Sequence, residues 1–142
     1  MNLEIPMTAF PMSTEIIMLG CAIALVLLQI GLQAGSSSMG LSIGYLMGPR
    51  DEAKTVSNVY AGRISRALHN ILETFPLFAA LALAVVVTGR TGGYAALGAQ
   101  IYVWARAIYV PVYVLGIPVV RTIAWAASMV GIVMMLAVLL GK

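Results

Sequence analysis

The sequence has few charged residues and a single cysteine, and both shortages limit what the chain can be. Charged residues make up 9% of the 142 positions and hydrophobic residues 61%, whereas a soluble domain carries about 25% charged residues. Because so few charges cannot solvate a soluble domain of this size, the composition predicts that a lipid bilayer surrounds most of the chain. Cys21 has no second cysteine to pair with, which excludes an intrachain disulfide.

The residues that usually hold metals, phosphates or nucleic acids are also scarce. One histidine and one cysteine cannot supply a common set of metal ligands, so we expect no metal. Neither a glycine-rich phosphate loop nor a nucleophilic serine elbow occurs. The net charge of +3 is small and scattered, so nucleic acid is not an expected partner.

Apolar stretches dominate what remains and predict an all-α integral membrane domain. Each is close to the roughly 20 residues that cross a bilayer. The four predicted transmembrane helices cover residues 14–34, 62–88, 94–115 and 119–140. The Gly-Ser run at 35–38 is expected to end the first helix, and the Gly-Ile-Pro sequence at 116–118 predicts a tight turn. The fold class predicted from this pattern is a single four-helix bundle.

The basic residues predict how the bundle is oriented. With an even number of spans, both termini lie on one side of the membrane. The side of the long connection holds Arg50, Lys54, Arg63, Arg66 and Arg121, and the other side Arg90 and Lys142. The positive-inside rule therefore places the connection in the cytoplasm and both termini outside it.

Two opposite charges fall inside the predicted spans. A charge there costs about 3 kcal/mol on insertion scales and is usually paired. Glu73 and Arg106 lie at about the same depth when 1.5 Å per residue is counted from the cytoplasmic ends of their helices. The sequence thus predicts a Glu73–Arg106 ion pair that joins the second and third helices as a structural contact, with ligand contact as the alternative.

Other polar side chains share helix faces at helical spacing. These are Arg66, Asn70 and Glu73 on the second helix, and Tyr102, Arg106, Tyr109 and Tyr113 on the third. Five residues lie closer to the cytoplasmic surface and would together line a basic pocket open to that side, suited to a small anion bearing carboxylates: Arg66, Asn70, Tyr109, Tyr113 and Arg121. The alternative is that they anchor the chain at headgroup level. His69 is interpreted as an interhelical contact, with a catalytic base as the alternative.

Two runs of residues resemble a known family. The second helix contains Arg63-x-x-Arg66-Ala67-x-His69-Asn70-x-x-Glu73, followed by Pro76. The third contains Ala105-Arg106-x-x-Tyr109-x-x-x-Tyr113-x-x-Gly116, with Arg121-Thr122 after it. Both resemble the signatures of the MAPEG superfamily, the membrane-associated proteins in eicosanoid and glutathione metabolism.

The resemblance implies a homotrimer that binds glutathione as a co-substrate between neighbouring subunits. By matching position, its contacts would be Arg66, Asn70, Glu73, Tyr109, Tyr113 and Arg121. Arg121 would stabilise the thiolate, since a cation lowers the pKa of a thiol, and Tyr113 would donate to the sulfur. The implied activity is that of a glutathione transferase or peroxidase acting on apolar electrophiles.

Some positions depart from the pattern of catalytic members, which leaves a second function open. Gln33 and His69 stand where an arginine is expected, Leu68 where a histidine is, and Trp125 replaces a tyrosine. The alternative is a non-catalytic lipid-binding or scaffolding subunit, with membrane lipids and other membrane proteins as partners. A transporter is disfavoured because four short helices with one buried ion pair offer no relay.

Overall fold

A computed structural model of the chain describes residues 12–49, 51–52 and 58–141. The predicted orientation in the membrane used three residues that lie outside the described ones: Arg50, Lys54 and Lys142. The described residues form helices and no strand. The helices are α1 (Thr14–Ser38), α2 (Ile43–Met47), α3 (Val59–Val87), α4 (Gly93–Leu115) and α5 (Pro118–Leu139).

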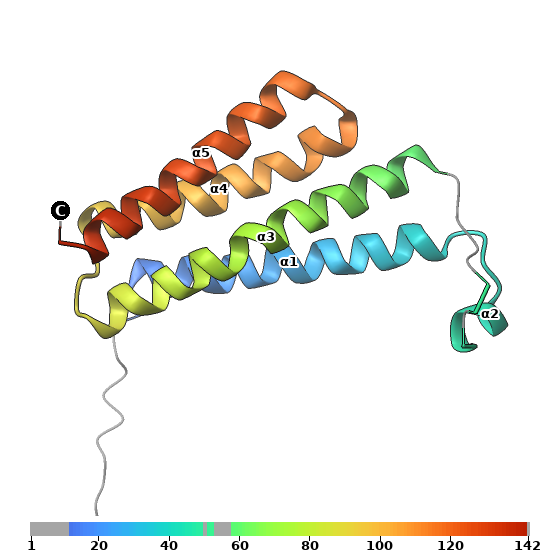
Figure 1. The fold of residues 1–142 in the computed structure, drawn as a ribbon, viewed down its shortest axis with the longest axis horizontal. Helices are drawn as coiled ribbons and strands as arrows, with labels where there is room; N and C mark the ends of the chain where they lie inside the picture. Colours follow the sequence, from blue (N-terminus) through green and yellow to red (C-terminus); the bar gives the residue numbers. More distant parts are fainter. Residues whose placement is uncertain (1–11, 50, 53–57, 142) are drawn as a thin grey trace, which may run out of the picture.

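The four long helices run in alternating directions alongside one another (Figure 1). α1 packs on α3, α4 packs on α5, and α3 and α4 join the two pairs. Both ends of the described chain lie at one end of the molecule, and α2 and the α4–α5 turn lie toward the other. At that second end the α4–α5 pair diverges from α3.

Three of the described helices, α1, α3 and α5, are long and apolar enough to cross a membrane. α4 has 23 residues but falls short in hydropathy. Its sequence includes Gln100, Arg106 and four tyrosines. Arg106, Tyr102 and Tyr109 are buried against the other helices, so packing within the chain accommodates these polar groups.

The first helix continues through Ser38, four residues beyond its predicted end at position 34. The hydroxyls of Ser36 and Ser38 donate to the carbonyl oxygens of Gln33 and Gly35, each at 3.0 Å. Gln33 Nε2 also donates to Ser37 Oγ at 3.1 Å. Because these serines bond within their own helix, the Gly-Ser run does not break it, and the predicted end is wrong.

The turn between α4 and α5 depends on Gly116. Its backbone is left-handed, with φ +78°, and its N–H bonds to the carbonyls of Val112 and Tyr113 at 3.1 Å. A Cβ at this position would lie 2.8 Å from the guanidinium of Arg63. The missing side chain therefore lets Arg63 of α3 reach across and donate to the carbonyl of Val114 at 3.0 Å.

α4 and α5 pack most closely where Gly98 faces Gly131. A Cβ on Gly98 would lie 2.6 Å from the carbonyl oxygen of Gly131, and a Cβ on Gly131 would lie 2.5 Å from that of Gly98. Only glycine fits at such a crossing, and small residues allow close contact between membrane helices. This crossing fixes the rotation of α5 against α4.

Gly131→Ala is expected to destabilise the protein by about 1–3 kcal/mol, the usual effect of overpacking. The added methyl would push α5 away from the Gly98 carbonyl. Unfolding of the purified protein in detergent measures the change. Gly20→Ala is the matched control, because nothing lies within 4 Å of a Cβ at that α1 position. Equal melting of Gly131→Ala and Gly20→Ala would contradict the close crossing.

Candidate functional site

Arg106 of α4 lies at the centre of the polar contacts and is 1% exposed. Its Nη1 donates to Asn70 Oδ1 at 2.5 Å, and its Nη2 donates to Thr74 Oγ1 at 2.9 Å. The ring centroids of Tyr102 and Tyr109 lie 5.6 and 5.4 Å from its Cζ. The guanidinium is thus held by two neutral oxygens of α3 and by two aromatic rings.

The predicted Glu73–Arg106 ion pair is absent from the described part of the chain. Glu73 is exposed, and the guanidinium bonds to Asn70 and Thr74 instead. Helix geometry explains the difference. Asn70 and Thr74 are four residues apart and face α4, while Glu73 is rotated by about 100° from Thr74. Arg106 therefore meets α3 beside Glu73, between Asn70 and Thr74, but the Glu73 side chain lies on another face of the helix.

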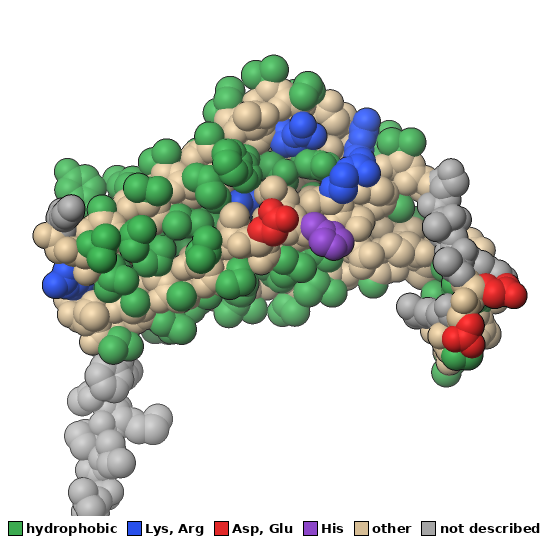
Figure 2. Space-filling view, in the orientation of Figure 1, with side chains coloured by type: hydrophobic (Ala, Val, Ile, Leu, Met, Phe, Trp, Pro, Cys, Tyr) green, Lys and Arg blue, Asp and Glu red, His purple; other side chains and the backbone are tan. Residues whose placement is uncertain are grey.

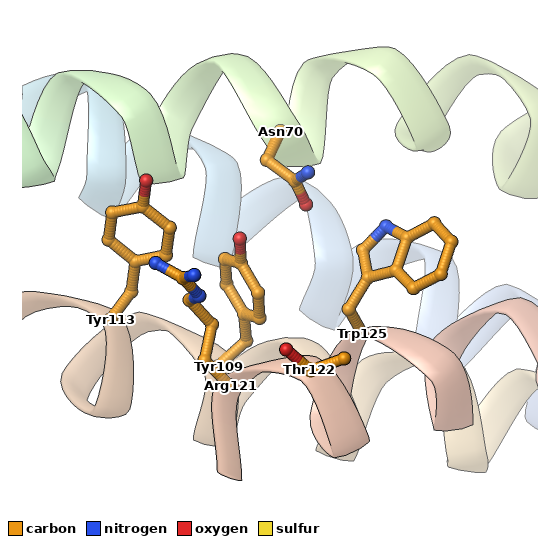
Figure 3. Close-up of a pocket in the computed structure, with 6 residues that line it drawn as sticks. All are labelled: Asn70, Tyr109, Tyr113, Arg121, Thr122 and Trp125. Carbon is orange, nitrogen blue, oxygen red and sulfur yellow. The ribbon is translucent and has the colours of Figure 1, made fainter. Parts of the chain in front are cut away.

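A cavity of about 320 Å³ opens where α3, α4 and α5 meet (Figure 3). Its lining consists of Asn70 from α3, Tyr109 and Tyr113 from α4, and Arg121, Thr122 and Trp125 from α5. Four of these were predicted site residues: Asn70, Tyr109, Tyr113 and Arg121. Helices distant in sequence therefore bring an amide, two phenols and a guanidinium together.

Tyr113 lies between two arginines at the edge of this cavity. Arg66 Nε of α3 donates to the Tyr113 hydroxyl at 3.3 Å. Arg121 Cζ lies 4.9 Å from the centroid of the Tyr113 ring (Figure 3). Since the hydroxyl accepts from Arg66, its own proton is free to be donated to a ligand. The predicted residue Arg66 thus reaches the site through Tyr113.

His69 and Glu73 lie outside the cavity, on an exposed face of α3. His69 Nδ1 is 2.9 Å from the carbonyl oxygen of Ser65 in the same helix. A carbonyl only accepts, so Nδ1 is the donor in this contact. In the described part of the chain His69 therefore bonds to its own helix, and the predicted contact between two helices is not found there. Figure 2 shows basic, acidic and histidine side chains on one face among hydrophobic ones.

Two buried polar residues of α1 were not singled out from the sequence. Gln29 is 2% exposed, and both of its side-chain polar atoms lack a hydrogen-bond partner in the described residues. Glu15 is buried, and its Oε1 accepts from the N–H of Gly92 at 2.7 Å. The sequence did carry a signal for Gln29, because it is a lone amide side chain within a long apolar run. Gln33 lies elsewhere, at a separate cavity beside α2.

Comparison with known proteins connects this site to a family. The sequence model of the MAPEG family matches residues 18–141, a range that includes every residue lining the cavity. No curated protein matches the chain.

Proposed function

Since the chain belongs to the MAPEG family and is an integral membrane protein, we propose that it binds glutathione in the cavity between α3, α4 and α5. It would transfer the tripeptide to apolar electrophiles dissolved in the bilayer. The observation that carries this proposal is Tyr113 at the cavity, whose hydroxyl accepts from Arg66 and whose ring lies against the guanidinium of Arg121. Glutathione offers carboxylates and a thiol, which match a site of cations and hydroxyl donors.

The chemistry required of the site is to hold the thiol of glutathione as a thiolate. A free thiol has a pKa of about 8.5, and a neighbouring cation lowers it. Arg121 lies in the first turn of α5, so its charge and the helix N-terminus both favour an anion. Tyr113 would donate its hydroxyl proton to the sulfur as a hydrogen bond.

The transfer step itself needs no group beyond the two substrates. After the thiol proton leaves to solvent, the sulfur lone pair attacks an electrophilic carbon, a C–S bond forms, and the leaving group departs with its electron pair. Apolar electrophiles would enter from the bilayer, where they concentrate. The exposed indole of Trp125 borders the cavity and would contact the electrophile.

The exposed polar face of α3 supports a homotrimer. Arg66, His69 and Glu73 are exposed on the single chain, although α3 is apolar enough to span a membrane. Such groups cannot face lipid and need cover from protein. A neighbouring copy would supply that cover. In this proposed assembly α4 is the fourth membrane span, and the end of the bundle near α2 lies in the cytoplasm.

The purified protein is accordingly expected to migrate as a trimer. Chemical cross-linking and native mass measurement in mild detergent would report the number of copies. A stable, folded monomer would contradict the assembly, because the polar face of α3 would then have no cover.

The proposed activity is tested by glutathione-dependent conjugation of a generic apolar electrophile, such as a chlorodinitrobenzene. Turnover above the uncatalysed rate is expected for the purified protein in lipid nanodiscs. A folded trimer that neither binds nor consumes glutathione would instead favour the second function, a lipid-binding or scaffolding subunit of a larger membrane assembly.

A further inference from the structure

The side chain of Asn70 has one face toward Arg106 and one toward the cavity. A guanidinium carries only N–H donors and no acceptor. At 2.5 Å from Arg106 Nη1, the group of Asn70 that faces it must therefore be the carbonyl oxygen and not the NH₂ group. A flipped amide would bring two donors together.

The opposite edge of the amide is open. Asn70 lines the cavity, and its Nδ2 has no hydrogen-bond partner within the described chain. In the described residues, every buried side-chain polar atom without a partner belongs to another residue. The unpartnered NH₂ group of Asn70 is therefore not buried but accessible. Two N–H donors are consequently left for a ligand on the cavity side.

We infer that Arg106 fixes the Asn70 amide so that the cavity presents an N–H donor, and that this donor selects a carboxylate of the ligand. The inference rests on the proposed function, in which glutathione is that ligand. Arg121 lines the same cavity, so a carboxylate would meet a donor and a cation together. An ammonium group would meet only donors at these two residues.

Arg106 acts here as a positioning residue. At 1% exposed it is closed off from the cavity, and both of its Nη atoms are engaged by α3. Thr74 accepts from the second nitrogen, so two contacts one turn apart on the same face of α3 hold the guanidinium in place. The orientation of Asn70 therefore follows from a contact that the ligand never touches.

The substitution Asn70→Asp separates the two contacts of this side chain. Aspartate keeps an oxygen toward Arg106 and removes the donor toward the cavity. Melting of Asn70→Asp should equal or exceed that of the wild type, because the contact with Arg106 gains a charge. Glutathione affinity by titration calorimetry should fall about tenfold to a hundredfold, the effect of losing a hydrogen bond to a charged group.

Asn70→Leu is the matched control, since it removes both contacts at similar volume. It should melt below both the wild type and Asn70→Asp, because Arg106 then lacks an acceptor. In turnover assays Asn70→Asp should raise the KM for glutathione and leave kcat nearly unchanged, as expected when a binding contact is lost. Affinity equal to wild type in Asn70→Asp, or melting as low as that of Asn70→Leu, would overturn the inference.

Variants of Arg106 test the positioning itself. Lysine can only donate, so Arg106→Lys should keep the amide oriented and retain part of the affinity. Glutamine can also accept, so in Arg106→Gln the amide is free to turn, and affinity should fall further in protein that is still folded. Equal affinities in the two variants would overturn the positioning role. If the wild type itself binds no glutathione, the proposed function fails, while the melting order of the Asn70 variants still tests the contact with Arg106.

Discussion

Replacing Arg106 with methionine is expected to destabilise the protein by about 1–3 kcal/mol. The substitution fills most of the volume but leaves Asn70 Oδ1 without its donor, whereas Thr74 Oγ1 keeps its contacts with the Tyr102 hydroxyl and the Ile71 carbonyl. A buried acceptor that loses its partner costs about 1–3 kcal/mol. A lower melting temperature of the purified protein in detergent would report the effect.

Glu73→Gln is the informative companion to this variant. The carboxylate of Glu73 does not bond to Arg106 in the chain, so its neutralisation is expected to change stability by less than about 1 kcal/mol. Destabilisation by Glu73→Gln as severe as that by Arg106→Met would contradict the structure. It would show that the ion pair expected from the sequence forms in the assembled protein.

Arg121→Ala is expected to lower kcat/KM for glutathione conjugation by about a hundredfold, the scale seen when one electrostatic stabiliser is removed. The variant loses the cation proposed to hold the thiolate and also the group stacked on Tyr113. Initial rates at varied glutathione and pH measure the loss. The rate should recover at higher pH, where more of the thiol ionises without help.

Arg121→Lys separates charge from stacking at the same position. It keeps a cation but not the planar guanidinium, so it should retain an intermediate rate. Wild-type rates in Arg121→Ala would exclude the proposed role of this residue.

The long helices could be read from the sequence because apolar runs of bilayer length leave few alternatives. Their ends were harder to read where side chains bond to the backbone. Ser36 and Ser38 carry α1 past the glycine at which it was expected to stop, because their hydroxyls bond within the helix. The sequence alone does not reveal whether such a hydroxyl continues a helix or competes with it.

Helical spacing also grouped several residues of the site correctly. Tyr109 and Tyr113 of α4 both line the cavity because an interval of four residues returns to the same helix face, and Asn70 meets them from α3. The rotation of each helix toward its neighbours was not predictable in the same way. The rotation depends on close helix crossings, such as that between Gly98 of α4 and Gly131 of α5. On α3 the rotation places Thr74, and not Glu73, toward Arg106.

The most direct measurement of the central claim is glutathione binding to the purified protein by titration calorimetry. The proposed site predicts saturable binding at millimolar concentration or below. Affinity should be strongly reduced in Arg121→Ala and reduced in Arg66→Ala, which loses the contact with the Tyr113 hydroxyl. Absence of binding at millimolar glutathione, or affinities unchanged by both substitutions, would contradict a glutathione site between α3, α4 and α5.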